Sequence, residues 1–147
     1  MMHDTITILL GEDDPEVIYL IGEAFDESRV PHQLVTVSDG EELLDYLNHR
    51  DKYANQESWE LPDIIVLDLN MPRKDGRESL REIKADPDLR RIPVVVFTNS
   101  RDEEDIVRCY DLGIAGYITK PVSFMGLLSA IQSFCAYWLQ AVTLPSK

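Results

Sequence analysis

A continuous apolar run ends in a single acid in the stretch Ile64-Ile65-Val66-Leu67-Asp68-Leu69-Asn70-Met71-Pro72. Four apolar residues in a row predict a strand that is buried on both faces, as in a parallel sheet covered by helices on either side. The acid follows directly, where the chain leaves the sheet. The rest of the sequence extends this pattern in both directions.

Four further strand-like runs alternate with helical patterns along the chain. They lie at residues 5–10, 33–37, 93–97 and 117–119. Asp14-Pro15 opens the first helix, with a capping side chain before a proline at the first helical position. Ser38–Glu41 and Ser100–Glu103 fit capping boxes for later helices. Strict alternation of this kind predicts an α/β fold with a doubly wound, five-stranded parallel sheet.

Length and composition indicate one domain. The chain has 147 residues, of which 44% are apolar. We expect residues 1–147 to form a single domain with a core at about 5–139, a short C-terminal extension at 140–147 and no output domain. A formal net charge of −13 argues against nucleic-acid binding.

The sequence also suggests a compartment. No N-terminal signal pattern and no membrane-length apolar run is present, so a membrane is not expected as a partner. Cys109 and Cys135 do not form a close pair. A reducing cytoplasm is the simplest setting for them.

Polar residues that could form a functional site follow four of the five predicted strands. They are Glu12, Asp13, Asp68, Thr98 and Lys120. The carboxyl ends of strands in a doubly wound sheet converge on one crevice, where ligands usually bind. We therefore expect these five side chains to share a site.

Three carboxylates gathered in one place repel one another unless a cation joins them. Oxygen ligands favour a hard ion, which here is Mg²⁺ with Mn²⁺ as a substitute. Asp14 is the better helix cap because Pro15 follows it, which leaves Glu12 and Asp13 for the metal. A strand-end carboxylate beside such an ion is a competent nucleophile toward phosphoryl groups. Lys120 and Thr98 would stabilise the incoming oxygens.

These residues resemble the receiver domain of two-component response regulators over about residues 5–139. Four signatures match in order: Leu10-Gly11-Glu12-Asp13-Asp14, Val66–Gly76, Val95-Val96-Phe97-Thr98 and Tyr117-Ile118-Thr119-Lys120-Pro121. The resemblance implies the flavodoxin-like (β/α)5 fold. The loop before Asp63, the segment Met71–Glu78 and the C-terminal segment Trp138–Pro145 resemble the receiver-only regulators that serve phytochrome kinases, especially in cyanobacteria.

The resemblance also implies a role for each site residue. Asp68 is the phosphoacceptor, and the metal ligands are Glu12, Asp13, Asp68 and the backbone carbonyl of Asn70. Thr98 and Lys120 contact the phosphoryl group, and Tyr117 is the aromatic that turns inward when Thr98 moves. Lys120-Pro121 is expected to be a cis peptide. The donor is a phosphohistidine on a sensor histidine kinase, and the protein is a signalling switch, not an enzyme, although it takes part in its own phosphorylation and dephosphorylation.

The last helix, at about residues 123–142, is apolar on more than one face. We expect its core stripe to be Phe124, Leu127, Leu128, Ile131, Cys135, Trp138 and Val142. A second set faces elsewhere: Ala130, Phe134, Tyr137 and Ala141. A monomer needs only one apolar face, so the second set predicts a homodimer through this helix. The alternative is an amphipathic helix with scattered exposed aromatics.

Other functions fit less well. A phosphatase of the haloacid dehalogenase type needs a second acid two residues after the first, and Asn70 stands there. A flavodoxin-like cofactor binder needs a phosphate loop where Glu12-Asp13-Asp14 would repel phosphate. A degenerate receiver acting as a constitutive interaction module is an alternative that the intact set Glu12, Asp13, Asp68, Thr98 and Lys120 opposes. A phosphorelay intermediate is a further alternative. The downstream partner is not predicted.

Overall fold

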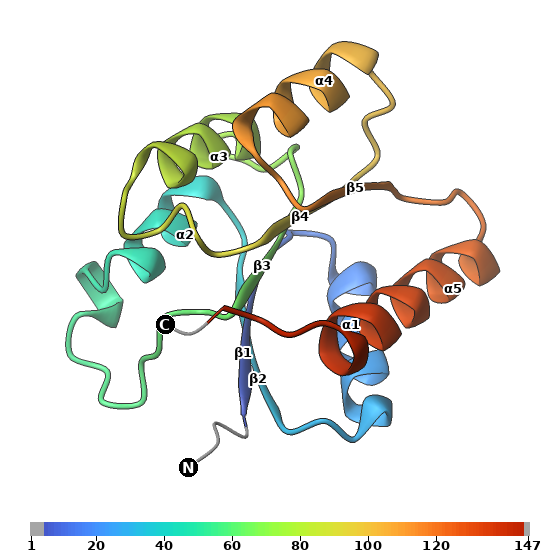
Figure 1. The fold of residues 1–147 in the computed structure, drawn as a ribbon, viewed down its shortest axis with the longest axis horizontal. Helices are drawn as coiled ribbons and strands as arrows, with labels where there is room; N and C mark the ends of the chain where they lie inside the picture. Colours follow the sequence, from blue (N-terminus) through green and yellow to red (C-terminus); the bar gives the residue numbers. More distant parts are fainter. Residues whose placement is uncertain (1–4, 146–147) are drawn as a thin grey trace.

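A computed structural model describes residues 5–145, and the fold alternates strands and helices as expected (Figure 1). The strands are β1 Ile6–Gly11, β2 His32–Val37, β3 Ile64–Leu67, β4 Val94–Thr98 and β5 Gly116–Thr119. The helices are α1 Pro15–Ser28, α2 Gly40–Leu47, α3 Gly76–Ala85, α4 Glu103–Leu112 and α5 Phe124–Cys135, with a short 3₁₀ turn at Asp51–Tyr53 and a π-helical extension at Ala136–Ala141.

The five strands form one parallel sheet in the order β2-β1-β3-β4-β5. Helices α1 and α5 cover one face, and α2, α3 and α4 cover the other (Figure 1). β3 lies in the middle, and all four of its residues are buried, as its apolar sequence predicts. The predicted doubly wound α/β fold is confirmed.

Each of the helices α1, α2 and α4 begins after a capping acid, and two of these caps differ from the predicted ones. Asp14 caps α1 as predicted and accepts a hydrogen bond from the Glu16 N–H at 3.0 Å. The cap of α2 is Asp39, one residue later than predicted, and the cap of α4 is Asp102, two residues later. Both acids offer the same short acceptor as serine, so either residue type satisfies the free N–H groups of a first turn.

The last helix needs a larger correction. Phe134, expected to face away from the core, is buried, whereas Phe124, expected in the core, is 53% exposed. Phe134 follows Leu127 by seven residues and Ile131 by three, which places all three on one helical face. Phe124 begins the helix beside the exposed Val122.

The end of this helix widens into a π-helix at Ala136–Ala141. Hydrogen bonds between residues five apart bring Leu139 onto the face of Phe134, and Leu139 is buried in the same cluster. The chain then runs back toward the amino end of β3 (Figure 1). Pro145 lines a hollow there with Leu61 and Pro93.

Candidate phosphoacceptor site

Strand register brings the functional residues to one edge of the sheet. Gly11 of β1 pairs with Leu67 of β3, which pairs with Val96 of β4. The residues that follow Gly11 and Leu67 therefore leave the sheet side by side. The Asp68 N–H donates to the Gly11 carbonyl at 2.9 Å, which fixes the two loops together.

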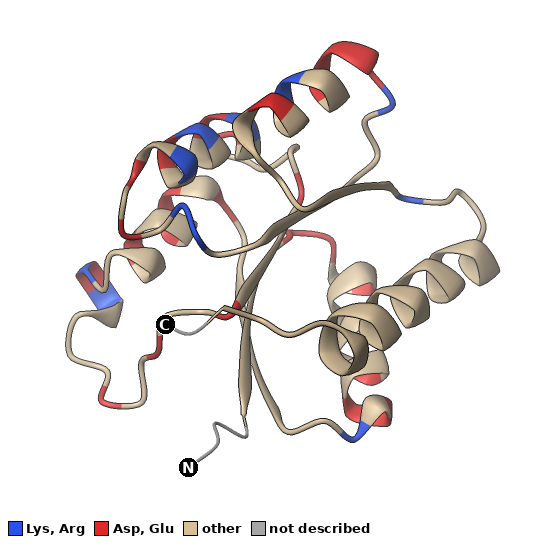
Figure 2. Ribbon diagram, in the orientation of Figure 1, with Lys and Arg blue, Asp and Glu red and all other residues tan. Residues whose placement is uncertain are grey.

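Three acidic side chains meet where these loops leave the sheet. Oxygens of Glu12, Asp13 and Asp68 lie within 4.8 Å of one another. Glu12 and Asp68 are buried and Asp13 is exposed. Figure 2 shows the acidic residues on the loops that follow β1 and β3. A set of carboxylate oxygens at this spacing, open to water on one side, fits a divalent cation that keeps some of its waters.

Lys120 reaches the same acids from the end of β5. Its Nζ lies 2.9 Å from Glu12 Oε1 and 3.0 Å from Asp68 Oδ2, and the side chain is 6% exposed. Burial raises the pKa of Glu12 to about 7 despite this contact. For Lys120, burial opposes the charge, but the hydrogen bond to Glu12 and the charges of both acids raise its pKa. We conclude that Lys120 stays protonated at neutral pH.

Asp68 has a defined partner for each oxygen. The fully buried Thr98 donates its hydroxyl to Asp68 Oδ1 at 2.7 Å, and the Asn70 N–H donates to the same oxygen at 3.1 Å. Lys120 donates to the other oxygen. Charge-assisted bonds of this kind orient a carboxylate strongly.

Tyr117 lies close to this network without touching Asp68. Its hydroxyl donates to the Ser100 carbonyl at 3.0 Å, in the loop between β4 and α4. The ring is partly buried against the core under α2, α3 and α4.

The prediction of a cis peptide at Lys120-Pro121 is wrong, because residues 5–145 contain no cis peptide bond. The trans form is the intrinsically preferred one even before proline.

The structure adds residues that the sequence pattern did not single out. Arg77 on α3 and Asp105 on α4 form a bidentate ion pair, and Ser100 donates to Asp105 at 2.7 Å. Arg77 lies in the segment Met71–Glu78 that carries a resemblance, but its pairing with Asp105 could not be predicted, because it depends on how α3 and α4 pack. Asp105 is the last of four consecutive acids at residues 102–105, and acids are common in the first turn of a helix.

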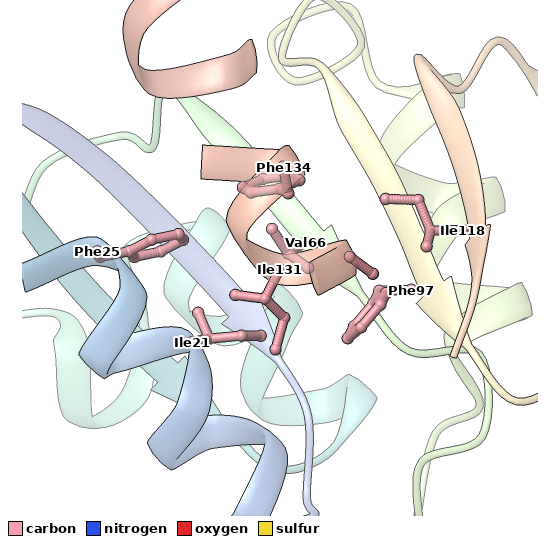
Figure 3. Close-up of a pocket in the computed structure, with 8 residues that line it drawn as sticks. Ile21, Phe25, Val66, Phe97, Ile118, Ile131 and Phe134 are labelled. Atoms are coloured by element: carbon pink, nitrogen blue, oxygen red, sulfur yellow. The ribbon is translucent and has the colours of Figure 1, made fainter. Parts of the chain in front are cut away.

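A separate cavity lies on the opposite face of the sheet, between α1, α5 and the strands (Figure 3). It encloses about 10 Å³, and all its lining side chains are apolar, among them Phe25, Phe97 and Phe134. A void of this size without polar partners does not hold water or a charged ligand.

The fold and the strand-end acids with their threonine and lysine define a receiver domain. The chain belongs to the response regulator receiver domain family, whose model matches residues 8–132. It is a signalling protein of that family. None of the helices within residues 5–145 combines the length and apolar character of a membrane span.

The chain is also similar to individual proteins of this family. The chain is 41% identical to response regulator Rcp1 of Synechocystis sp. over 139 residues, which are 95% of this chain and 92% of Rcp1. The crystal structure of the Mn²⁺-bound form of Rcp1 superimposes with a TM-score of 0.92 at 40% identity, covering 96% of this chain and 99% of that one.

A second solved structure has a comparable fold and a higher sequence identity. The phosphorylated cyanobacterial phytochrome response regulator RcpA superimposes with a TM-score of 0.90 at 48% identity, covering 97% of this chain and 99% of RcpA. The Rcp1 structure holds Mn²⁺, and in this chain the oxygens of Glu12, Asp13 and Asp68 are spaced closely enough to hold a divalent ion.

Proposed function

We propose that this protein is a receiver-only response regulator that takes a phosphoryl group from a sensor histidine kinase onto Asp68. The carrying observation is that Asp68 is buried and contacts both Thr98 and Lys120, with Glu12 and Asp13 adjacent. In this reaction the phosphorus–nitrogen bond of a phosphohistidine breaks and an oxygen–phosphorus bond to Asp68 forms. The histidine regains a proton.

The surrounding residues stabilise the transferred group. Glu12, Asp13, Asp68 and the Asn70 carbonyl would hold Mg²⁺ or Mn²⁺, which supplies charge neutralisation at the phosphoryl oxygens. Lys120 and Thr98 now bind the carboxylate oxygens of Asp68. On phosphorylation they follow the negative charge to the phosphoryl oxygens, since those oxygens are the stronger acceptors.

The same motion would reach Tyr117. In this structure the Tyr117 hydroxyl already donates to the Ser100 carbonyl while Thr98 donates to Asp68. Holding Thr98 at the phosphoryl group would stabilise this inward position of Tyr117, so that phosphorylation increases its population. The face formed by α4 and β5 then changes its affinity for a downstream protein. The protein is thus a switch that takes part in its own phosphorylation and dephosphorylation and does not turn over an external substrate.

Intact-mass spectrometry tests the phosphoacceptor. A small-molecule phosphodonor with Mg²⁺ should add one phosphoryl group to the wild type and none to Asp68→Asn or to metal-free protein. Asp26→Asn, an acid of 74% side-chain exposure on α1, is the matched control and should label normally. Undiminished labelling of Asp68→Asn would overturn the assignment.

The kinase is proposed to be of the phytochrome class. The similarity to Rcp1 and RcpA over nearly the whole chain supports this choice. Transfer from the autophosphorylated kinases of the source organism should be fastest from a phytochrome kinase. A faster transfer from an unrelated kinase would contradict this choice.

A cytoplasmic location is proposed as well. Cys109 and Cys135 are buried free thiols, which fits such a location.

The last helix is proposed to form a homodimer. Residues 121–146 contain no Asp, Glu, Lys or Arg, in a chain with net charge −13. Figure 2 shows α5 without charged residues, whereas α1 to α4 carry many. Tyr137 is 57% exposed and Met125 is 69% exposed on this segment. Two copies of an acidic protein repel least where neither is charged, and charged residues are depleted in interface cores.

Sedimentation at tens of micromolar tests the dimer, with and without phosphorylation. Tyr137→Glu should shift the protein toward monomer, because it would bury a charge in the interface. Tyr19→Glu changes an equally exposed tyrosine on α1 and should leave self-association unchanged. A wild type that is monomeric under both conditions would remove the proposal.

A further inference from the structure

A polar cluster joins α3, α4 and the loop between β4 and α4. Arg77 donates to Asp105 through Nε at 2.7 Å and through Nη2 at 2.6 Å. Ser100 donates to the same carboxylate at 2.7 Å. The other side of the Arg77 guanidinium donates to both carboxylate oxygens of Asp75 at 3.1 Å. One arginine thus connects the start of α3 with the start of α4.

The cluster is connected to the phosphoacceptor in two directions. Through Ser100, it reaches Thr98 by a long 3.5 Å contact from the Ser100 N–H, and Thr98 donates to Asp68. Through Asn70, it reaches Asp68 again, because Arg77 Nη1 lies 3.4 Å from Asn70 Oδ1 and the Asn70 N–H donates to Asp68. The contacts form a closed ring that begins and ends at Asp68.

The ion pair differs from an ordinary surface pair. Asp105 has only 13% of its side chain exposed, and both of its oxygens are bound by a planar guanidinium. The nearby Arg108–Glu104 pair on α4 is 3.5 Å long, with side chains 74% and 70% exposed. Bidentate, partly buried pairs fix geometry, whereas exposed pairs contribute little. The hydrogen bond from Arg77 also holds the pKa of Asp105 at about 2.

We propose that Arg77 is a positioning residue for phosphorylation: by holding Asp105, it fixes the Ser100 loop that receives Tyr117 and the Asn70 loop beside Asp68. This inference rests on the proposed function of Asp68. Arg77 touches neither the acceptor nor the metal ligands' carboxylates. Its effect passes through the two loops that frame the site, so the packing of α3 against α4 becomes part of the switch.

The test compares Arg77→Gln and Asp105→Asn with the control Arg108→Gln in full-length protein. With acetyl phosphate and Mg²⁺, the two variants should be phosphorylated about fivefold more slowly, the effect of about 1 kcal/mol in the barrier. The double variant should be no slower than Arg77→Gln alone, because Arg77→Gln already removes the contact to Asp105. Arg108→Gln should match the wild type.

A second readout separates positioning from general destabilisation. The ring resonances of Tyr117 and the amide exchange of Ser100 should change in Arg77→Gln and Asp105→Asn, with circular dichroism confirming folded protein. Arg108→Gln should leave both unchanged. Wild-type phosphorylation rates and wild-type Tyr117 resonances in Arg77→Gln would overturn the inference. If the wild type takes up no phosphoryl group, the proposed function fails, and the Tyr117 and Ser100 signals alone then decide whether Arg77 positions the loop.

Discussion

The ammonium of Lys120 lies 2.9 Å from Glu12 Oε1, and both side chains are almost completely buried. The same ammonium binds Asp68 at 3.0 Å. One buried cation therefore serves two buried carboxylates, and its removal would leave both acids without a protein counter-charge. In a receiver domain, a divalent ion bound to Glu12 and Asp68 would share this task with Lys120.

We predict that Lys120→Met destabilises the metal-free protein by about 3 kcal/mol, because breaking a buried ion pair strands the remaining charges. Added Mg²⁺ should restore part of the loss. Urea unfolding with and without EDTA measures both effects. Lys52→Met removes an exposed lysine paired with Glu42 and should cost far less than Lys120→Met in either buffer. Equal losses in the two lysine variants would contradict the prediction.

The Arg77–Asp105 pair predicts a dependence of stability on pH. The hydrogen bond from Arg77 lowers the pKa of Asp105 from 3.8 to about 2 in the folded protein. The unfolded chain therefore binds this proton first as the pH falls, so the stabilisation is complete above pH 3.8 and is lost between there and about 2. It amounts to at most about 2 kcal/mol.

Urea unfolding of the wild type and of Asp105→Asn at several pH values measures this contribution. The wild type should exceed the variant by a margin that is constant near neutrality and shrinks as the pH falls below 3.8. If the difference in the free energy of unfolding does not change with pH, the ion pair makes no pH-dependent contribution to stability.

Features that depend on the order of residues along the chain could be predicted from the sequence. Strand-end residues such as Asp68 and Lys120 could be placed together because parallel strands end at one edge. Asp14 could be identified as a cap because Pro15 follows it. These inferences need only periodicity and the geometry of a doubly wound sheet.

Features that depend on packing between elements were missed. Arg77 and Asp105 are 28 residues apart, and nothing in either helix marks them as partners. The sequence pattern placed Trp138 in the core stripe, whereas Leu139 is the buried residue of the π-helical segment Ala136–Ala141. A pattern that assumes a constant helical period cannot predict such a segment.

The loop after β3 predicts a glycine requirement. A Cβ on Gly76 would lie 2.3 Å from the Asp68 carbonyl oxygen and 2.7 Å from Leu69 Cα. Gly76→Ala should therefore displace the phosphoacceptor loop, cost about 1–3 kcal/mol and slow phosphorylation. Gly116→Ala is the control, since a Cβ there meets nothing within 4 Å. Denaturant unfolding and intact-mass kinetics would measure both variants, and a Gly76→Ala protein as stable and as reactive as the control would refute the requirement.

Two phenylalanines of the last helix give the sharpest test of its orientation. Phe134 is 9% exposed and packs against the ring of Phe25 at a centroid distance of 6.1 Å, whereas Phe124 is 53% exposed. Phe134→Ala should cost about 3–5 kcal/mol, because it opens a cavity beside the small void between α1 and α5. Phe124→Ala should change the free energy of unfolding by no more than about 0.5 kcal/mol. Chemical denaturation at a concentration low enough to exclude dimers compares the two, and the opposite ranking would mean that α5 is rotated about its axis relative to this structure.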